Sequence, residues 1–256
     1  MIGLRFLGTG GLGIRPRNKF SRDYRRFSTL LVDEHIIIDP SEDIFEFEES
    51  FMLSGMLREV KEAFITHSHI DHFSVSAIEK LAKSGNLRVY ATDALKEELS
   101  SVRGIELVLL IPFSLVRIGK YSILPLPANH KTDIKTETAL NFLIECEGKT
   151  VFYGIDGSFI NPEAWHILKE IKLDAVILDC ALANDGYSQA SVNHNNLAAA
   201  IAVKDVFLSA NVAGENTKFI LSHIPTSKKH SIHDELSEAV ADMPFKIAYD
   251  GYFIGI

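Results

Sequence analysis

Residues 64–74 read FITHSHIDHFS, which places three histidines and one aspartate within six positions, although the whole chain has 10 histidines. In an extended segment alternate side chains point to the same side, so His67 and His69 can hold one ion while Asp71 and His72 reach a neighbouring position. Imidazole suits zinc, iron and other transition ions, and an added carboxylate favours a second divalent ion close by. The stretch therefore predicts a metal site at the end of a strand, the alternative being a solvated histidine loop.

A binuclear site needs more ligands than one loop can supply, and three further candidates follow strand-like runs. LPLPANHKT ends an apolar strand at His130, TVFYGIDGS ends another at Asp156, and KFILSHIPT ends a third at His223. Each alone is weak evidence, because a lone histidine at a strand end is more often a surface residue. Together with the 64–74 loop they predict one convergent site.

The composition is that of an ordinary globular protein. The chain has 256 residues, of which 46% are hydrophobic and 23% charged, and this predicts one domain over residues 1–256. A formal charge of -8 argues against a general nucleic-acid binder. The N-terminus has no pattern of a secretory signal, and no run of 18 apolar residues occurs. We therefore expect a cytoplasmic protein without a membrane segment, in which Cys146 and Cys180 are free thiols.

Strand-like runs and helical periodicity alternate along both halves of the chain. The predicted strands lie at 4–8, 28–33, 35–40, 62–66, 105–110, 115–118, 121–126, 138–145, 150–154, 174–179 and 218–222, with two more at the C-terminus. The predicted helices lie at 75–85, 161–172, 195–206 and 231–241. Sheets covered by helices in both halves predict an α/β fold, a four-layer α/β/β/α sandwich.

At this point the sequence resembles the metallo-β-lactamase superfamily, whose signature is a His-x-His-x-Asp-His loop, here residues 67–72. The resemblance implies that His67, His69 and His130 bind one ion. It implies that Asp71, His72 and His223 bind a second ion, with Asp156 as a bridging carboxylate. The expected cofactors are two divalent ions, with zinc first and manganese or iron as alternatives.

Within the superfamily the chain is most similar to the cyclic phosphate phosphodiesterases of phosphonate degradation and the tRNA-processing zinc nucleases. The similarity lies in the stretches FLGTGG, DYRR, LPLPANH, AVILDCALA, SVNHNNLAAAIA and ILSHI. It implies hydrolysis of a small anionic phosphodiester, cyclic or linear. Because two divalent ions lower the pKa of a water between them, we expect hydroxide oriented by Asp71 and Asp156 to attack phosphorus. His194 is the expected acid or phosphate contact. The cysteine cluster that many of these relatives carry is missing, so the substrate is left open.

A basic loop follows the first glycines in an otherwise acidic chain. Its basic residues are Arg15, Arg17, Lys19, Arg22, Arg25 and Arg26. Such a loop can draw an anionic substrate, and we predict substrate contacts for Arg22, Arg25 and Arg26. A solvated loop is the alternative, and the same choice applies to His230 and His233.

Other functions compete with the phosphodiesterase. The same ions can open lactones or thioesters, because the metal chemistry does not select phosphorus by itself. A metal-binding protein without catalysis is a further class. Residues 8–13 match Gly-x-Gly-x-x-Gly after a strand, with Asp33 following 20 residues later, and this suggests a dinucleotide-binding oxidoreductase. That fold requires a crossover helix that the loop at 14–28 does not offer. A homodimer is possible, and a nucleic-acid partner is not expected.

Overall fold

Two seven-stranded sheets form the centre of the structure, a computed structural model that describes residues 1–226 and 231–256. The first sheet has the order β14 (Phe253–Gly255), β1 (Gly3–Gly8), β2 (Thr29–Val32), β3 (Ile36–Ile38), β4 (Glu62–Phe64), β5 (Leu87–Ala91) and β6 (Ile105–Leu109). The second has the order β13 (Phe245–Ile247), β12 (Lys218–Ser222), β11 (Ala175–Asp179), β10 (Lys149–Gly154), β9 (Leu140–Cys146), β8 (Tyr121–Pro127) and β7 (Val116–Ile118). Each sheet has a parallel half, β3 to β6 in one and β10 to β13 in the other, and an antiparallel half.

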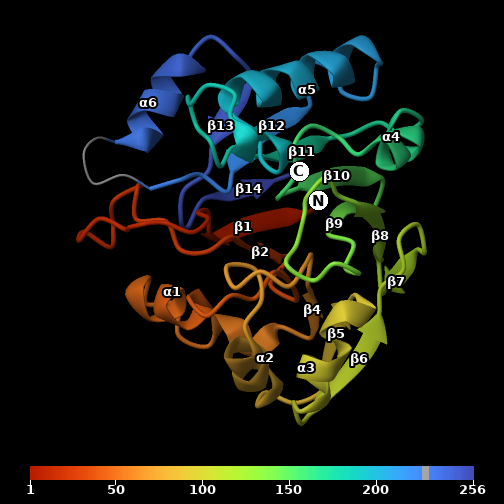
Figure 1. Ribbon diagram of the computed structural model, residues 1–256. Helices are drawn as coiled ribbons and strands as arrows, with labels where there is room; N and C mark the ends of the chain where they lie inside the picture. The colour runs from red at the N-terminus through yellow and green to blue at the C-terminus, as the bar shows by residue number, and fades with distance from the viewer. Residues whose placement is uncertain (227–230) are drawn as a thin grey trace.

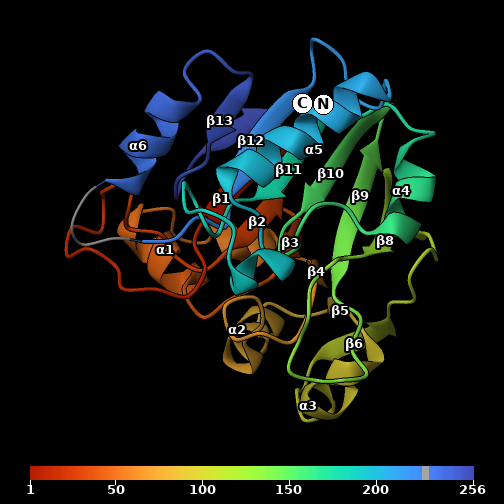
Figure 2. The ribbon, with the colours of Figure 1, turned by 45° about the horizontal axis from the view of Figure 1, so that its top comes forward.

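Helices cover the outer face of each sheet. Figures 1 and 2 show α1 (Ile44–Ser50), α2 (Val75–Ala82) and α3 (Lys96–Ser100) on the first sheet, and α4 (Pro162–Leu168), α5 (Leu197–Ser209) and α6 (Ile232–Ala239) on the second. Three short 3₁₀ segments lie at Met56–Glu59, Asp93–Leu95 and Gln189–Val192. One apolar core lies between the sheets and one under each helical layer. This is the four-layer sandwich that the sequence predicts.

Local sequence accounts for the helix ends nearest the site. Helix α2 begins after Ser74, whose side chain accepts a hydrogen bond from the Ala77 amide. Helix α5 begins after Asn196, whose side chain accepts from the Ala199 amide. Gly85, three residues beyond the end of α2, has φ of 85°, a left-handed conformation that favours glycine.

Besides the 3₁₀ segments, two helices and one strand were missing from the prediction, namely α1, α3 and β5. The two helices have 7 and 5 residues, which is too short for a helical period to be recognised. The dinucleotide-binding alternative is wrong, because β1 pairs antiparallel with β2 and residues 9–28 form no helix between them. A parallel strand reached by a crossover helix, which that motif requires, is therefore absent from this described segment.

Two buried arginines fasten the loop between β1 and β2 to the C-terminal turn. Arg26 is fully buried and donates to Asp250 from its backbone nitrogen (2.8 Å) and its guanidinium (3.1 Å). Arg25, also fully buried, donates to Thr9 Oγ1 and to the Ala248 carbonyl. Thr9 in turn donates to Asp250 at 2.9 Å. The network ties the glycine-containing loop to the last strands of the chain.

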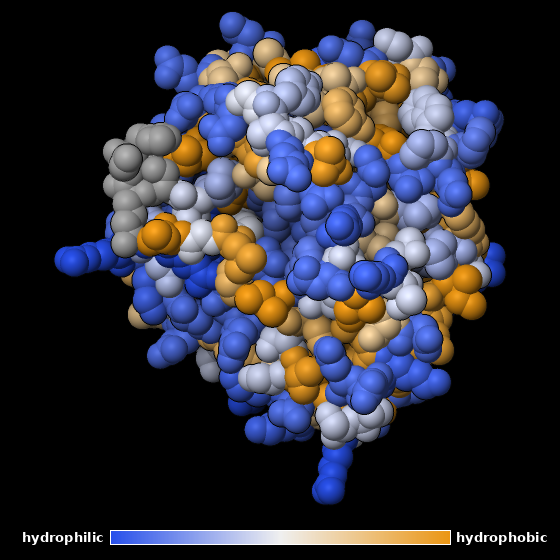
Figure 3. Space-filling view, in the orientation of Figure 1, coloured by the Kyte–Doolittle hydropathy of each residue, from blue (hydrophilic) through white to orange (hydrophobic). Residues whose placement is uncertain are grey.

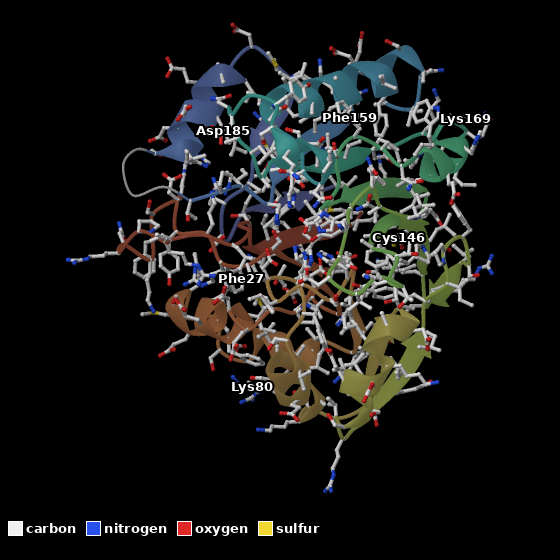
Figure 4. The ribbon with its side chains drawn as sticks, viewed as in Figure 1. Phe27, Lys80, Cys146, Phe159, Lys169 and Asp185 are labelled. Atoms are coloured by element: carbon white, nitrogen blue, oxygen red, sulfur yellow. The ribbon has the colours of Figure 1, made fainter. Side chains whose placement is uncertain are left out.

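Within the described residues no helix is long and apolar enough to cross a membrane. The cytoplasmic location, the single domain and the possible homodimer stay predictions. Cys146, labelled in the interior in Figure 4, and Cys180 are both buried free thiols.

Asp250→Ala should lower the free energy of unfolding by about 3 kcal/mol, because the buried Arg26 guanidinium then keeps only the partly exposed Glu46 as a carboxylate partner. Urea unfolding followed by circular dichroism measures the change. Asp242→Ala is the matched control, since Asp242 is exposed. Equal stabilities of the two variants would show that the Arg26–Asp250 pair does not stabilise the fold.

Candidate metal centre

The predicted ligands come from four separate strand ends, and the structure brings them together. Residues 67–72 follow β4, His130 follows β8, Asp156 follows β10 and His223 follows β12. One group of potential ligand atoms contains His67, His69, His130 and Asp156, a second contains Asp71, His72 and His223, and a third contains Asp156, His194 and His223. Within each group the atoms lie within 4.8 Å of one another.

The carboxylate of Asp156 contacts histidines of both principal groups. Its Oδ2 lies 3.3 Å from His67 Nε2 and 3.2 Å from His72 Nε2, and its Oδ1 lies 2.9 Å from His223 Nε2. Oδ2 is also 3.5 Å from His130 Nε2. This is the position that the sequence predicts for a bridging carboxylate.

Backbone conformation aims these side chains. Asp156 and His223 both have φ of 53°, and Asp39, at the end of β3, has φ of 55°. Left-handed backbone is uncommon for residues other than glycine, and such strain concentrates at functional sites. Each residue therefore turns sharply out of its strand at the edge where the site lies.

Asp39 fixes the orientation of one histidine from each group. His72 Nδ1 lies 2.8 Å from Asp39 Oδ2, so its proton is donated to this carboxylate. The hydroxyl of Thr66 donates to Asp39 at 2.9 Å and, because it has a single proton, accepts from His67 Nδ1, also at 2.9 Å. Both histidines are assigned the tautomer with the proton on Nδ1, which leaves Nε2 free to bind a cation.

Two further histidines are held in the same way. Ser28 Oγ donates to the Gly10 carbonyl and lies 2.8 Å from His223 Nδ1, whose proton it accepts. His130 Nδ1 lies 3.1 Å from the Asn193 carbonyl, which can only accept. Four Nε2 lone pairs therefore point toward the centre.

The arrangement fits a metal ion. His69 Nδ1 lies 2.9 Å from His67 Nε2 and 3.2 Å from His130 Nε2, so three imidazole nitrogens converge with one proton at most among them. Burial lowers the pKa of His130 to about 3, although Asp156 opposes the shift, and this keeps the ring neutral. A cation is the group that such converging lone pairs require.

The second group also fits a cation. His72 Nε2 and Asp156 Oδ1 are buried and make no hydrogen bond of good geometry, although Asp156 Oδ2 lies 3.2 Å from the first and His223 Nε2 lies 2.9 Å from the second. Burial opposes ionisation of Asp156, yet His223 and His72 hold the pKa of its carboxyl well below its usual range. Burial likewise opposes a charge on His72, but Asp156 and Asp39 raise its pKa well above its usual value. A proton on His72 Nε2 stands where a divalent cation would bind.

His194 lies beside the two groups and is held by a carboxylate that the sequence prediction missed. Its Nδ1 lies 2.7 Å from Asp179 Oδ2, and its ring stacks on that of His223 with centroids 5.6 Å apart. Burial lowers the pKa of His194, but the hydrogen bond to Asp179 outweighs it and raises the pKa to about 9. Asp179 and Asp39 each end a buried strand, in the runs VILD and IIID, and this same signal identified Asp156.

A small pocket opens onto these residues, with a volume of about 280 Å³. Its polar lining consists of His69, Asp71, Asp156, His194 and His223, and its other lining residues are Gly11, Leu12, Ala181, Leu182 and Pro225. Figure 3 shows a hydrophilic hollow near the centre of this face, with hydrophobic residues along one side. A ligand of this pocket meets the candidate metal ligands on one side and an apolar wall on the other.

Steric contact explains why the loop beside this site contains glycine. A Cβ atom on Gly11 would lie 2.7 Å from His223 Nε2, which is too close for any side chain. The glycines thus let the loop pass against a predicted metal ligand, and no dinucleotide is needed to explain them.

The expected contacts of the basic loop with substrate are corrected. Arg25 and Arg26 are fully buried in the Asp250 network, and neither they nor Arg22 line the pocket. The reason is that a buried carboxylate more than 220 residues away in the chain captures these cations. Arg22 instead contacts His233, which also lies away from the pocket, and His230 lies outside the described residues.

Comparison with known families accounts for the geometry. A sequence model of the β-lactamase superfamily domain matches residues 34–224, about three quarters of the chain. The chain belongs to the β-lactamase superfamily. The superfamily prediction is therefore confirmed, and comparison with curated proteins finds no significant match.

Solved structures share the fold of this superfamily member at low sequence identity. A diphosphatase from the PhnP family has 17% identity and a TM-score of 0.73, covering 100% of this chain and 98% of the other. Zn²⁺-bound PqqB from Methylobacterium extorquens has 15% identity and a TM-score of 0.76, covering 99% and 100%. The short form of human tRNase Z has 16% identity and a TM-score of 0.69, covering 99% of each chain. Together with the His/Asp cluster, the fold supports a hydrolase that uses divalent metal ions.

Asp39→Asn should weaken the binding of both ions by roughly 10- to 100-fold, because the carboxylate orients one histidine in each group. Ser28→Ala should weaken the binding of one ion only, because His223 is the one predicted ligand that Ser28 contacts. Competition with a chromogenic chelator, together with metal analysis, measures both effects. Unchanged affinity for two ions in Asp39→Asn would contradict the assigned orientation.

Proposed function

We propose that the protein is a metal-dependent phosphodiesterase that hydrolyses a small phosphodiester, cyclic or linear, with Zn²⁺ as the first candidate ion and Mn²⁺ or Fe²⁺ as alternatives. The observation that carries the proposal is the position of Asp156, which contacts histidines of two ligand groups beside a histidine that is held by Asp179. The named activities of the PhnP-family diphosphatase and of tRNase Z, which share the fold, support phosphorus as the reacting centre.

The proposed ligand sets follow the two principal groups. His67, His69 and His130 would hold one ion, Asp71, His72 and His223 the other, and Asp156 would contact both. Two bound divalent ions lower the pKa of water and stabilise negative charge on the attacking and leaving oxygens of a phosphoryl group. Asp71 and Asp156 line the pocket and accept hydrogen bonds, so they can orient a water molecule toward the substrate.

His194 is the proposed proton donor. Its Nδ1 is occupied by Asp179, so Nε2 is the nitrogen left to give a proton or a hydrogen bond to a substrate oxygen. Asp179 would fix the ring orientation and stabilise the protonated imidazole. The ring stands at the pocket wall, where a departing oxygen can reach it.

The pocket favours a small substrate over a nucleic acid. Its volume is about 280 Å³, and the chain carries a formal charge of -8. Both features oppose the binding of a long polyanion. The expected partner is therefore a small anionic phosphodiester.

A lactone or thioester hydrolase is the second candidate, and one observation favours it. Leu12, Ala181, Leu182 and Pro225 form an apolar wall, and no arginine or lysine lines the pocket within the described residues. An uncharged ester would suit such a wall.

Phosphorus NMR of the metal-loaded protein with a ribose cyclic phosphate and a panel of linear phosphodiesters is the direct test. We expect ring opening or diester cleavage that is lost in His130→Ala, because one ion loses a ligand. A chelator should abolish turnover, and added zinc should restore it. Turnover of lactones or thioesters alone, by protein shown to hold two ions, would replace the phosphodiesterase with the second candidate. No turnover of any of these substrates would favour metal binding without catalysis.

His194→Ala should lower kcat by about 10²- to 10⁴-fold while both ions remain bound, because it removes the proton donor and leaves the predicted ligands in place. Asp179→Asn should lower kcat by less, since the imidazole remains. Steady-state kinetics on the best diester, with metal analysis of each variant, measures the effect. Full turnover in His194→Ala would remove His194 from the mechanism.

A further inference from the structure

A second cavity, of about 270 Å³, lies between α6, β13 and the turn that leads to β14. Its lining includes Arg22, His233, Lys246, Tyr249 and Tyr252. It shares no lining residue with the pocket at the candidate metal centre. The proposed phosphodiesterase activity makes no use of it.

His233 forms the inner wall of this cavity. His233 is only 3% exposed, and its backbone nitrogen donates to Asp23 at 2.8 Å. Arg25 Nη2 lies 3.3 Å from Nδ1 of the ring, and Arg22 Nη1 lies 3.2 Å from Nε2. Each ring nitrogen therefore faces a guanidinium group.

A neutral imidazole cannot satisfy both arginines. It has one nitrogen that accepts and one that carries a proton, whereas guanidinium groups only donate. Burial and the charges of Arg25 and Arg22 lower the pKa of His233 to about 4, so the ring is neutral near pH 7. One of the two arginines thus faces an N–H group and lacks an acceptor there.

The accepting nitrogen of His233 is expected to face Arg25, the buried arginine. Arg25 is fully buried, and His233 Nδ1 is the partner of its Nη2. An unpaired buried donor costs more than an exposed one, so we assign the lone pair to Nδ1 and the proton to Nε2. Two donors, His233 Nε2 and Arg22 Nη1, then face each other at the cavity wall, and residues 1–226 and 231–256 offer neither of them an acceptor there.

The described surroundings of these two donors supply no carboxylate to them. Within the described residues Arg22 has no carboxylate partner, and its guanidinium lies over the Tyr249 ring at 4.9 Å. Asp23 is the nearest acid, but its oxygens accept from Ser231 and from the His233 backbone. No acidic residue lines the cavity in the described part of the chain, whereas Lys246 does.

Apart from Ser237, whose hydroxyl donates to the His233 carbonyl, the remaining wall is apolar or aromatic. It contains Val240, Met243, Ile247 and the rings of Tyr249 and Tyr252. An oxyanion with an attached apolar or aromatic body would match both parts, because the head accepts from the two donors and the body packs on the rings.

We propose that this cavity is a binding site for a small carboxylate or phosphate compound with an apolar or aromatic body, whose oxyanion accepts hydrogen bonds from Arg22 and from His233 Nε2. The site is separate from the metal centre, and its occupant is a ligand, not the hydrolysed substrate.

The test uses the metal-loaded full chain with two probes, 4-bromobenzoate and 4-bromophenylphosphonate. Anomalous scattering from bromine in soaked crystals locates each probe, and NMR titration measures its affinity. Arg22→Gln removes the guanidinium at an exposed position, so the fold should be kept. Arg17→Gln is the matched control, because Arg17 is an exposed arginine of the same loop that does not line the cavity.

We expect bromine in the cavity and at least a tenfold loss of affinity in Arg22→Gln, with no change in Arg17→Gln. The probe that binds more tightly identifies the preferred head group. Bromine found only at the metal centre, or equal affinities in the two variants, would overturn the proposal. Neither result depends on whether the protein hydrolyses phosphodiesters.

Discussion

The site depends on one carboxylate, that of Asp156, which lies within 3.5 Å of four histidine nitrogens from three different segments. Buried imidazole lone pairs and a buried carboxylate are stable together only when a proton or a cation lies between them. The two sheets, the left-handed turns at the strand ends and the hydrogen bonds that Asp39 and Ser28 accept all hold these groups in place. The fold is therefore organised to keep metal-binding atoms close together at a cost in strain and desolvation.

Most of the order of strands and helices, the sandwich and the convergent ligands could be predicted from the sequence because they leave local signals, which α1, α3 and β5 do not. Strand runs that end in His or Asp point to one edge of a sheet, and the 67–72 motif has a fixed spacing. Asp39 and Asp179 show the same pattern, an acidic residue after a buried strand. Neither belongs to a recognisable sequence motif, because each acts by contacting a histidine elsewhere in the chain. Their roles emerge only once His72 and His194 are placed beside them.

The basic loop shows what sequence alone could not decide. Six basic residues within one loop form a pattern that suggests a solvent-exposed site for binding an anion. Whether Arg25 and Arg26 face solvent depends on Asp250, which is distant in sequence, and on the packing of the C-terminal turn. Both buried guanidinium groups make hydrogen bonds inside the protein and do not face a ligand in the pocket. Arg25 also fixes the tautomer of His233.

Because the arginines of the basic loop do not line the pocket, substrate recognition has to come from other groups. A phosphoryl group in the pocket would find positive charge only in the bound ions and His194 among the described lining residues. Its ester substituents would meet Leu12, Leu182 and Pro225, where apolar contact and not charge decides the fit. Discrimination between substrates would then depend on the shape and polarity of the ester group, because every phosphodiester offers the same monoanion to the ions. An additional phosphate on the substrate would need a cation that the described wall does not provide, so under the proposed function compact, singly charged diesters would fit this pocket best.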